Sequence, residues 1–145
     1  MAVNQRVGTA ARDVDVRISK TAADIIVPAD RLAELLERFD EACADHGLDG
    51  AVWGHISDGN LHPNVMPRSL EEWNAAREVM VAMGEAAIGL DGSPLAEHGV
   101  GRNPAKQALL RALYGDRAIA DMRAVKRALD PRGVFARGVI FEWTD

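Results

Sequence analysis

Hydrophobic residues along the chain follow strand-like and helix-like spacings in turn. The short β-branched run DIIVP, residues 24–28, predicts a strand that ends at Pro28. Apolar residues then recur every three or four positions, which predicts an amphipathic helix capped by Asp30 and ending at Gly47. The apolar face of this helix comprises Leu32, Leu35, Leu36, Phe39 and Cys43.

Two further strand-like runs, AVWGHIS and NLHPNVM, are joined by the pair Asp58–Gly59. An Asp-Gly pair between such runs predicts a β-hairpin, because both residue types tolerate the positive φ of a type I′ turn. Ser69 and Glu72 then form a capping box, which predicts a helix from Leu70 to about residue 90. Its expected buried residues are Trp73, Ala76, Met80, Met83 and Ala87.

The last third of the chain predicts more helix. Two helices are expected near residues 103–113 and 116–129, followed by a closing strand at 139–143. The order β-α-β-β-α, then more helix, predicts an α+β fold: a ferredoxin-like (split βαβ) antiparallel sheet packed by helices, with extra C-terminal helices. Residues 1–23 are expected to be irregular, and residues 24–145 to form one domain. The expected apolar residues of the last helix are Ile119, Met122, Val125 and Leu129.

The predicted hairpin separates apolar from polar side chains. If Asp58 and Gly59 are its two loop residues, His55 lies directly opposite His62. Side chains alternate between faces along a strand, and directly opposed residues share a face. One face then carries Val52, Ile56, Leu61 and Val65, and the other Trp53, His55, Ser57, Asn60, His62 and Asn64.

Two imidazoles on one face suggest a metal site. Opposed Cβ atoms lie roughly 4.5–5.5 Å apart, and a metal lies about 2.0–2.1 Å from each coordinating nitrogen. His55 and His62 could therefore converge on one ion. The alternative is that this polar face is simply solvated, which is usual for single histidines. A third ligand would favour the metal, and the segment AEHGVGR, residues 96–102, can supply one.

Composition limits the other possibilities. The formal net charge of −5 and a pI near 5.3 argue against a nucleic-acid-binding protein, since no basic stripe is present. Cys43 is the only cysteine and cannot form an internal disulfide, which favours the reducing cytoplasm. No apolar run has the roughly 20 residues of a membrane helix, and the first residues lack the apolar middle of a signal peptide.

The segments GHISDGNLHPNV, AEHGVGR and MRAVKRALDPRGVF together resemble the C-terminal domain of FAD-linked oxidases, which include D-lactate, glycolate and D-2-hydroxyglutarate dehydrogenases. The resemblance extends from about residue 24 to residue 141. It implies that His55, His62 and Glu97 bind a divalent metal, zinc or manganese, and that His98 is the catalytic base.

The same resemblance implies two kinds of substrate contact. Asn64 is expected near the substrate. A lysine or arginine ahead of the first strand is expected to bind the substrate carboxylate, and Lys20 is the candidate, with Arg17 behind it.

The chemistry is consistent with these assignments. Two imidazole nitrogens and one carboxylate leave open positions on Zn²⁺ or Mn²⁺, where a 2-hydroxy acid can chelate. The ion would lower the hydroxyl pKa, and His98 would take the proton while the Cα hydride passes to a flavin. In an extended segment the adjacent side chains of Glu97 and His98 would point in opposite directions, one to metal and one to substrate.

The resemblance also implies FAD, bound mainly by an N-terminal domain that this chain lacks. We find no glycine-rich strand-turn-helix motif for a pyrophosphate, and the family's closing Asn-Pro-Gly-Lys is replaced by ARGVI, residues 136–140. The chain is therefore expected to be the substrate and metal half of an FAD-dependent 2-hydroxy-acid dehydrogenase, inactive alone and dependent on an FAD-binding domain or subunit. The alternatives are a non-catalytic remnant or metal-binding assembly module, and a small metallohydrolase using a zinc-bound water.

Overall fold

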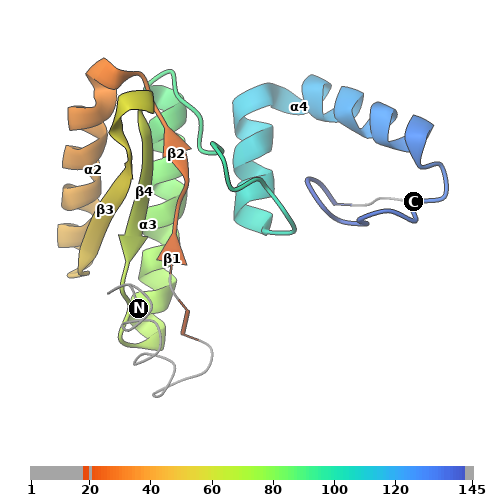
Figure 1. Cartoon of the computed structure of the whole chain (residues 1–145). Coiled ribbons are helices and arrows are strands. Elements are labelled where there is room, and N and C mark those ends of the chain that lie inside the picture. The colour runs from red at the N-terminus through yellow and green to blue at the C-terminus, as the bar shows by residue number, and fades with distance from the viewer. Residues whose placement is uncertain (1–17, 20, 143–145) are drawn as a thin grey trace. The chain divides into compact units, whose positions relative to one another are not determined.

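The computed structural model describes residues 18–19 and 21–142, and the chain divides into two compact units, residues 1–96 and 97–145 (Figure 1). No described helix is long and apolar enough to span a membrane. The elements of the first unit are β1 (Thr21–Ala22), β2 (Ile25–Ile26), the 3-10 helix η1 (Ala29–Arg31), α2 (Leu32–Asp45), β3 (Gly50–His55), the 3-10 helix η2 (Ile56–Asp58), β4 (Asn60–Val65) and α3 (Leu70–Gly89). The second unit contains α4 (Pro104–Leu129).

The sheet of the first unit has the predicted split β-α-β arrangement. Strand β4 lies between β3 on one side and β1 and β2 on the other, and it is antiparallel to all three. Strands β2 and β3 are therefore parallel to each other, joined through α2, with β4 between them. Residues 93–96 extend the outer edge of β2, where Ser93 exchanges two backbone hydrogen bonds of 2.9 and 2.7 Å with Ile26. The predicted α+β class is confirmed.

Pro63 explains why one edge of this sheet is divided into two short strands, β1 and β2. The backbone N–H of Ala23 donates to Pro63 O at 3.0 Å. Proline has no N–H, so the return hydrogen bond of this pair cannot form. The pattern of residues 1–23 did not predict β1, yet Thr21 pairs with Val65 in the register that Ile25 keeps with Leu61.

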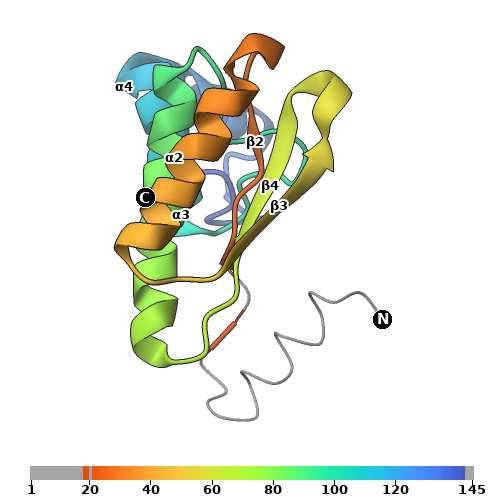
Figure 2. The same ribbon diagram turned by 90° about the vertical axis from the view of Figure 1, so that its left-hand side faces the viewer.

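The hydrophobic core lies between one face of the sheet and the helices α2 and α3, which both lie on that side (Figure 2). A Cβ at Gly50 on β3 would meet the Phe39 ring at 2.7 Å and the Cys43 sulfur at 2.8 Å, so α2 packs directly against the strand. Burial raises the pKa of the Cys43 thiol, with a smaller contribution from Asp40. Buried members of the core include Ile25, Leu35, Phe39, Cys43, Leu61, Val65, Ala76, Met80, Met83 and Ala87.

Two of the three helix-end predictions in this unit are confirmed. The cap predicted at Asp30 is wrong, because this residue lies inside η1 and the start of α2 has no side-chain cap hydrogen bond. Gly47 follows α2 with a φ of +62°, in the left-handed region that favours glycine. At the start of α3, the Ser69 hydroxyl oxygen accepts a hydrogen bond of 3.1 Å from Glu72 N. The Glu72 carboxylate accepts one of 2.7 Å from the backbone N–H of Arg68, one residue before the N-cap N–H that a capping box uses.

The hairpin turn differs from the prediction. Four residues, 56–59, separate the paired ends His55 and Asn60: a 3-10 turn followed by Gly59 at a φ of +75°. The predicted type I′ turn with a two-residue loop is therefore wrong. Ile56, predicted to face the core, is instead 72% exposed in the turn, and Ser57 is also outside the strand pairing.

Both helices predicted for the second unit form. Together they make up α4, which is broken at Gly115, where φ is +77°. The Asp130 carboxylate at the end of α4 accepts hydrogen bonds from the backbone N–H groups of Val134 and Phe135, and the hydrogen bond from Lys126 lowers its pKa to about 2.

The closing strand predicted for residues 139–143 is absent from its described part, 139–142. Of the predicted apolar stripe, Ile119 is buried, Met122 is intermediate, and Val125 and Leu129 are exposed.

Ala136 has a φ of +44°, a conformation that costs an L-residue with a Cβ roughly 1–2 kcal/mol. We expect Ala136→Gly to stabilise the chain by about 0.5–1 kcal/mol, because relief of this strain exceeds the added entropy of the unfolded chain. The same substitution at Ala120, exposed and inside α4, is expected to destabilise by about 1 kcal/mol. Urea unfolding of both variants measures the difference in the free energy of unfolding. Destabilisation by Ala136→Gly would contradict a strained, left-handed backbone at Ala136.

Candidate metal centre

The face of the sheet opposite the hydrophobic core is polar and carries both hairpin histidines. On β4, His62 faces Trp53 of β3, while His55 faces Asn60. The two imidazoles are thus diagonal neighbours instead of direct partners. Their ring centroids lie 5.8 Å apart and the rings are nearly perpendicular, at 88°. The predicted pairing is wrong by two residues, but the predicted shared face is correct, because a shift of two preserves the alternation.

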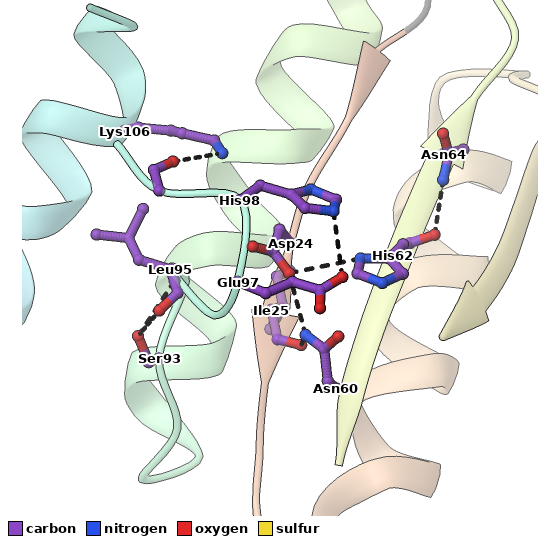
Figure 3. Close-up of polar contacts among 11 residues, drawn as sticks. Asp24, Ile25, Asn60, His62, Asn64, Ser93, Leu95, Glu97, His98 and Lys106 are labelled. Atoms are coloured by element: carbon purple, nitrogen blue, oxygen red, sulfur yellow. Dashed lines mark hydrogen bonds and ion pairs between the residues drawn. The ribbon is translucent and has the colours of Figure 1, made fainter. Parts of the chain in front are cut away.

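Asp24 lies directly opposite His62, on the chain segment that pairs with β4. The register that pairs Ala22 with Asn64 and Ile25 with Leu61 places Asp24 opposite His62. Asp24 Oδ1 lies 3.4 Å from His62 Nδ1, and both side chains are buried (Figure 3). Sequence reasoning missed this residue and assigned it only to a strand. A carboxylate opening a β-branched run beside a histidine-rich hairpin is the signal that would have indicated it.

Asn60 fixes the position of the Asp24 carboxylate. Its Nδ2 donates to Asp24 Oδ1 and to Ile25 O, both at 3.0 Å (Figure 3). The Asp24 carbonyl also accepts a hydrogen bond of 3.3 Å from Ala96 N. Side chain and backbone of Asp24 are thus both held, so the carboxylate meets the His62 ring in a defined geometry.

The two predicted substrate-binding residues differ in what the structure shows. Asn64 is fully buried on the polar face, where its Nδ2 donates to His62 O at 2.7 Å. The contact of Asn64 with substrate stays a prediction. Lys20 and Arg17 lie outside the described residues, so the predicted contact with a substrate carboxylate also stays a prediction.

Glu97 and His98 open the second unit within a bend. Glu97 Oε1 lies 3.3 Å from His98 Nε2, so the two side chains point toward each other (Figure 3). The expectation that they point in opposite directions is wrong, since it assumed an extended backbone. Gly99 and Gly101 follow with φ of +69° and +60°, which explains glycine at both positions. Lys106 Nζ holds this loop by donating to Gly99 O at 2.9 Å.

The donor types fit a divalent transition metal. The first unit brings together two imidazoles and a buried carboxylate, and the second brings together a carboxylate and an imidazole. Imidazole nitrogen and carboxylate oxygen are ligands that Zn²⁺ and Mn²⁺ accept. Asp24 beside Nδ1 of His62 also matches the way that proteins orient a metal-binding histidine through its other ring nitrogen.

The connections from β2 to α2 and from β4 to α3 do not have the residues of a flavin pyrophosphate site. They span residues 27–31 and 66–69 and contain no glycine. A dinucleotide-binding turn requires glycines where the backbone approaches the phosphates. We therefore assign no flavin contact to these residues.

Comparison with known proteins places these motifs in context. The model of the family "FAD linked oxidases, C-terminal domain" matches residues 5–140. The chain is 36% identical over 138 residues to a D-2-hydroxyglutarate dehydrogenase of Xanthomonas citri pv. viticola, covering 92% of this chain and 27% of that protein. It is 30% identical over 125 residues to a probable mitochondrial D-lactate dehydrogenase of Danio rerio, covering 85% and 25%. It is 31% identical over 120 residues to the glycolate oxidase subunit GlcD of Bacillus subtilis, covering 81% and 25%.

The chain spans about a quarter of the length of these curated relatives. The match to the family model nevertheless extends over nearly the whole chain, including both the histidine-bearing hairpin and the Glu97–His98 bend. The chain therefore belongs to the family of FAD-linked oxidase C-terminal domains.

Proposed function

We propose that this chain is the substrate- and metal-binding part of an FAD-dependent 2-hydroxy-acid dehydrogenase. The observation that carries the proposal is the buried His62, held beside Asp24 and adjacent to His55 on the polar face of the sheet. The relatives are named for D-lactate, glycolate and D-2-hydroxyglutarate. All three are 2-hydroxy acids, which supports a 2-hydroxy acid as the proposed substrate class.

In this proposal His55, His62 and Glu97 bind one divalent cation, zinc or manganese. Connectivity of the chain supports the inclusion of Glu97. Ala96 is hydrogen-bonded to the Asp24 carbonyl at the edge of the sheet, and Glu97 follows it directly. Consecutive Cα atoms are about 3.8 Å apart, so the Cα of Glu97 lies close to the hydrogen-bonded Ala96. This short link supports Glu97 as the third ligand.

The bound cation would supply Lewis-acid polarisation of the substrate hydroxyl. His98 then acts as the general base that takes the hydroxyl proton, a role that suits an imidazole near neutral pH. With Glu97 as a ligand, its carboxylate would no longer face His98 Nε2, and that nitrogen would be able to accept the substrate proton. Asn64 and Lys20 are proposed to position the substrate, with Lys20 at its carboxylate.

Oxidation of a 2-hydroxy acid to a 2-oxo acid also requires a hydride acceptor. We propose that FAD has this role and is bound mainly by a separate domain or subunit, so that the chain alone has no dehydrogenase activity. The cytoplasm remains the proposed location, since the buried Cys43 is the chain's one cysteine.

The first test is metal binding by the purified chain. We expect about one Zn²⁺ or Mn²⁺ per chain, and we expect His62→Ala to weaken binding at least about 100-fold, since loss of a ligand should exceed the loss seen for outer-sphere residues. His46→Ala, which changes the residue at the C-terminal cap of α2, is the matched control and should bind as the wild type does. Isothermal titration calorimetry and elemental analysis measure both quantities, and a wild-type chain that binds neither ion would refute the proposal.

A further inference from the structure

We propose that Asp24 is a positioning residue that fixes the tautomer and ring orientation of His62, so that Nδ1–H faces Asp24 and the Nε2 lone pair is left for the cation. The inference rests on the proposed metal function. It adds a residue that neither the sequence motifs nor the ligand set contains.

The geometry that supports it comes from strand pairing. Asp24 and His62 occupy opposed positions of antiparallel strands and share the polar face. The distance of 3.4 Å joins Asp24 Oδ1 specifically to Nδ1 of the imidazole. Nδ1 therefore faces the carboxylate, and Nε2, on the opposite side of the ring, is the nitrogen that we propose binds the metal.

Burial makes this contact selective. Asp24 is 1% exposed and His62 is 7% exposed. A carboxylate buried to this extent needs hydrogen-bond donors, because an uncompensated buried charge is costly. Asn60 supplies one donor. An Nδ1–H on His62, whose nitrogen lies 3.4 Å from Asp24 Oδ1, would direct a second N–H toward the same carboxylate. The opposite tautomer would place the Nδ1 lone pair against the carboxylate, an arrangement without a hydrogen bond and with electrostatic repulsion.

The chemical consequence follows from the two ring nitrogens of a neutral imidazole. One nitrogen carries the proton and the other carries the lone pair. A hydrogen bond at one nitrogen determines which of the two is protonated. A carboxylate acceptor at Nδ1 both selects the tautomer and raises the basicity of the ligating nitrogen. Asn60 has a second acceptor in Ile25 O, so removal of the Asp24 carboxylate leaves this amide group hydrogen-bonded.

Nitrogen-15 NMR of the metal-free chain, at a pH where His62 is neutral, measures the tautomer directly. We expect the wild type to show the Nδ1–H form, and Asp24→Ala to shift His62 toward the Nε2–H form that predominates in free histidine. A purely structural role of Asp24 would leave the tautomer unchanged. Asp24→Asn, which preserves the side-chain shape, provides a second variant if Asp24→Ala fails to fold.

Titration with Zn²⁺ and Co²⁺ provides the second measurement. We expect Asp24→Asn and Asp24→Ala to weaken binding about 10- to 100-fold and to alter the visible spectrum of the bound Co²⁺. Asp58→Asn removes the same charge from the exposed hairpin turn and serves as the control, with wild-type affinity expected.

The outcomes separate the two proposals. A wild-type chain that binds no cation overturns the proposed function, whereas the tautomer measurement still decides whether Asp24 orients His62. A wild-type chain that binds metal, together with Asp24 variants that keep its affinity and its His62 tautomer, overturns the inference alone. Weaker binding with a changed tautomer supports both.

Discussion

Turnover of a 2-hydroxy acid will fall by about 10²- to 10⁴-fold when His98 is replaced by alanine and the chain is assayed with an FAD-binding partner domain. The reason is that His98 is proposed to take the hydroxyl proton, and no hydride can leave the substrate carbon productively while that proton stays. Metal content of the variant should equal that of the wild type, because the proposed ligands are His55, His62 and Glu97. D-Lactate, glycolate and D-2-hydroxyglutarate are the substrates to compare.

His46→Ala is the control for this experiment and should retain wild-type turnover. Loss of the metal in His98→Ala would show that His98 is a ligand instead of the base. A wild-type chain that binds metal, yet shows no turnover with any FAD-binding partner, would favour the metal-binding assembly module. Hydrolysis of esters or phosphates by the chain alone would favour the metallohydrolase.

Gly59→Ala will destabilise the fold by about 2–5 kcal/mol, a large part of the 5–15 kcal/mol typical of a domain. Gly59 ends the hairpin turn with a φ of +75°, and a Cβ there would lie 2.0 Å from Val27 O. The clash is with backbone, so no side-chain rotation relieves it. Val27 N also donates to Gly59 O at 3.1 Å, and this hydrogen bond ties the hairpin tip to the residue after β2.

Gly89→Ala is the matched control, since Gly89 is the last residue of α3 and a Cβ there would meet no atom within 4 Å. We expect this variant to be more stable than the wild type by about 0.5–1 kcal/mol, because alanine is the better helix former. Urea unfolding followed by circular dichroism measures both variants. Equal midpoints for Gly59→Ala and the wild type would mean that the turn adopts another conformation in solution.

The sequence alone determined the features that depend on neighbouring residues. The spacing of Leu35, Phe39 and Cys43 defined the buried face of α2, and the capping box at Ser69 defined where α3 begins. The alternation of apolar and polar residues placed His55 and His62 on one face, and this assignment survived an error in register. It survived because the error was an even number of residues, which leaves the face of every side chain unchanged.

Only the tertiary structure decided the contacts between distant segments. The hairpin turn depends on Val27, whose backbone N–H holds Gly59 O, and no local pattern encodes that hydrogen bond. The strand expected near Ile140 does not form: its backbone N–H donates instead to Gly101 O, at a φ of +73° that is incompatible with a strand. The approach of Asp24 to His62 likewise depends on the pairing of β1 and β2 with β4. Such pairings are fixed by long-range hydrogen bonds and packing, which local sequence periodicity does not specify.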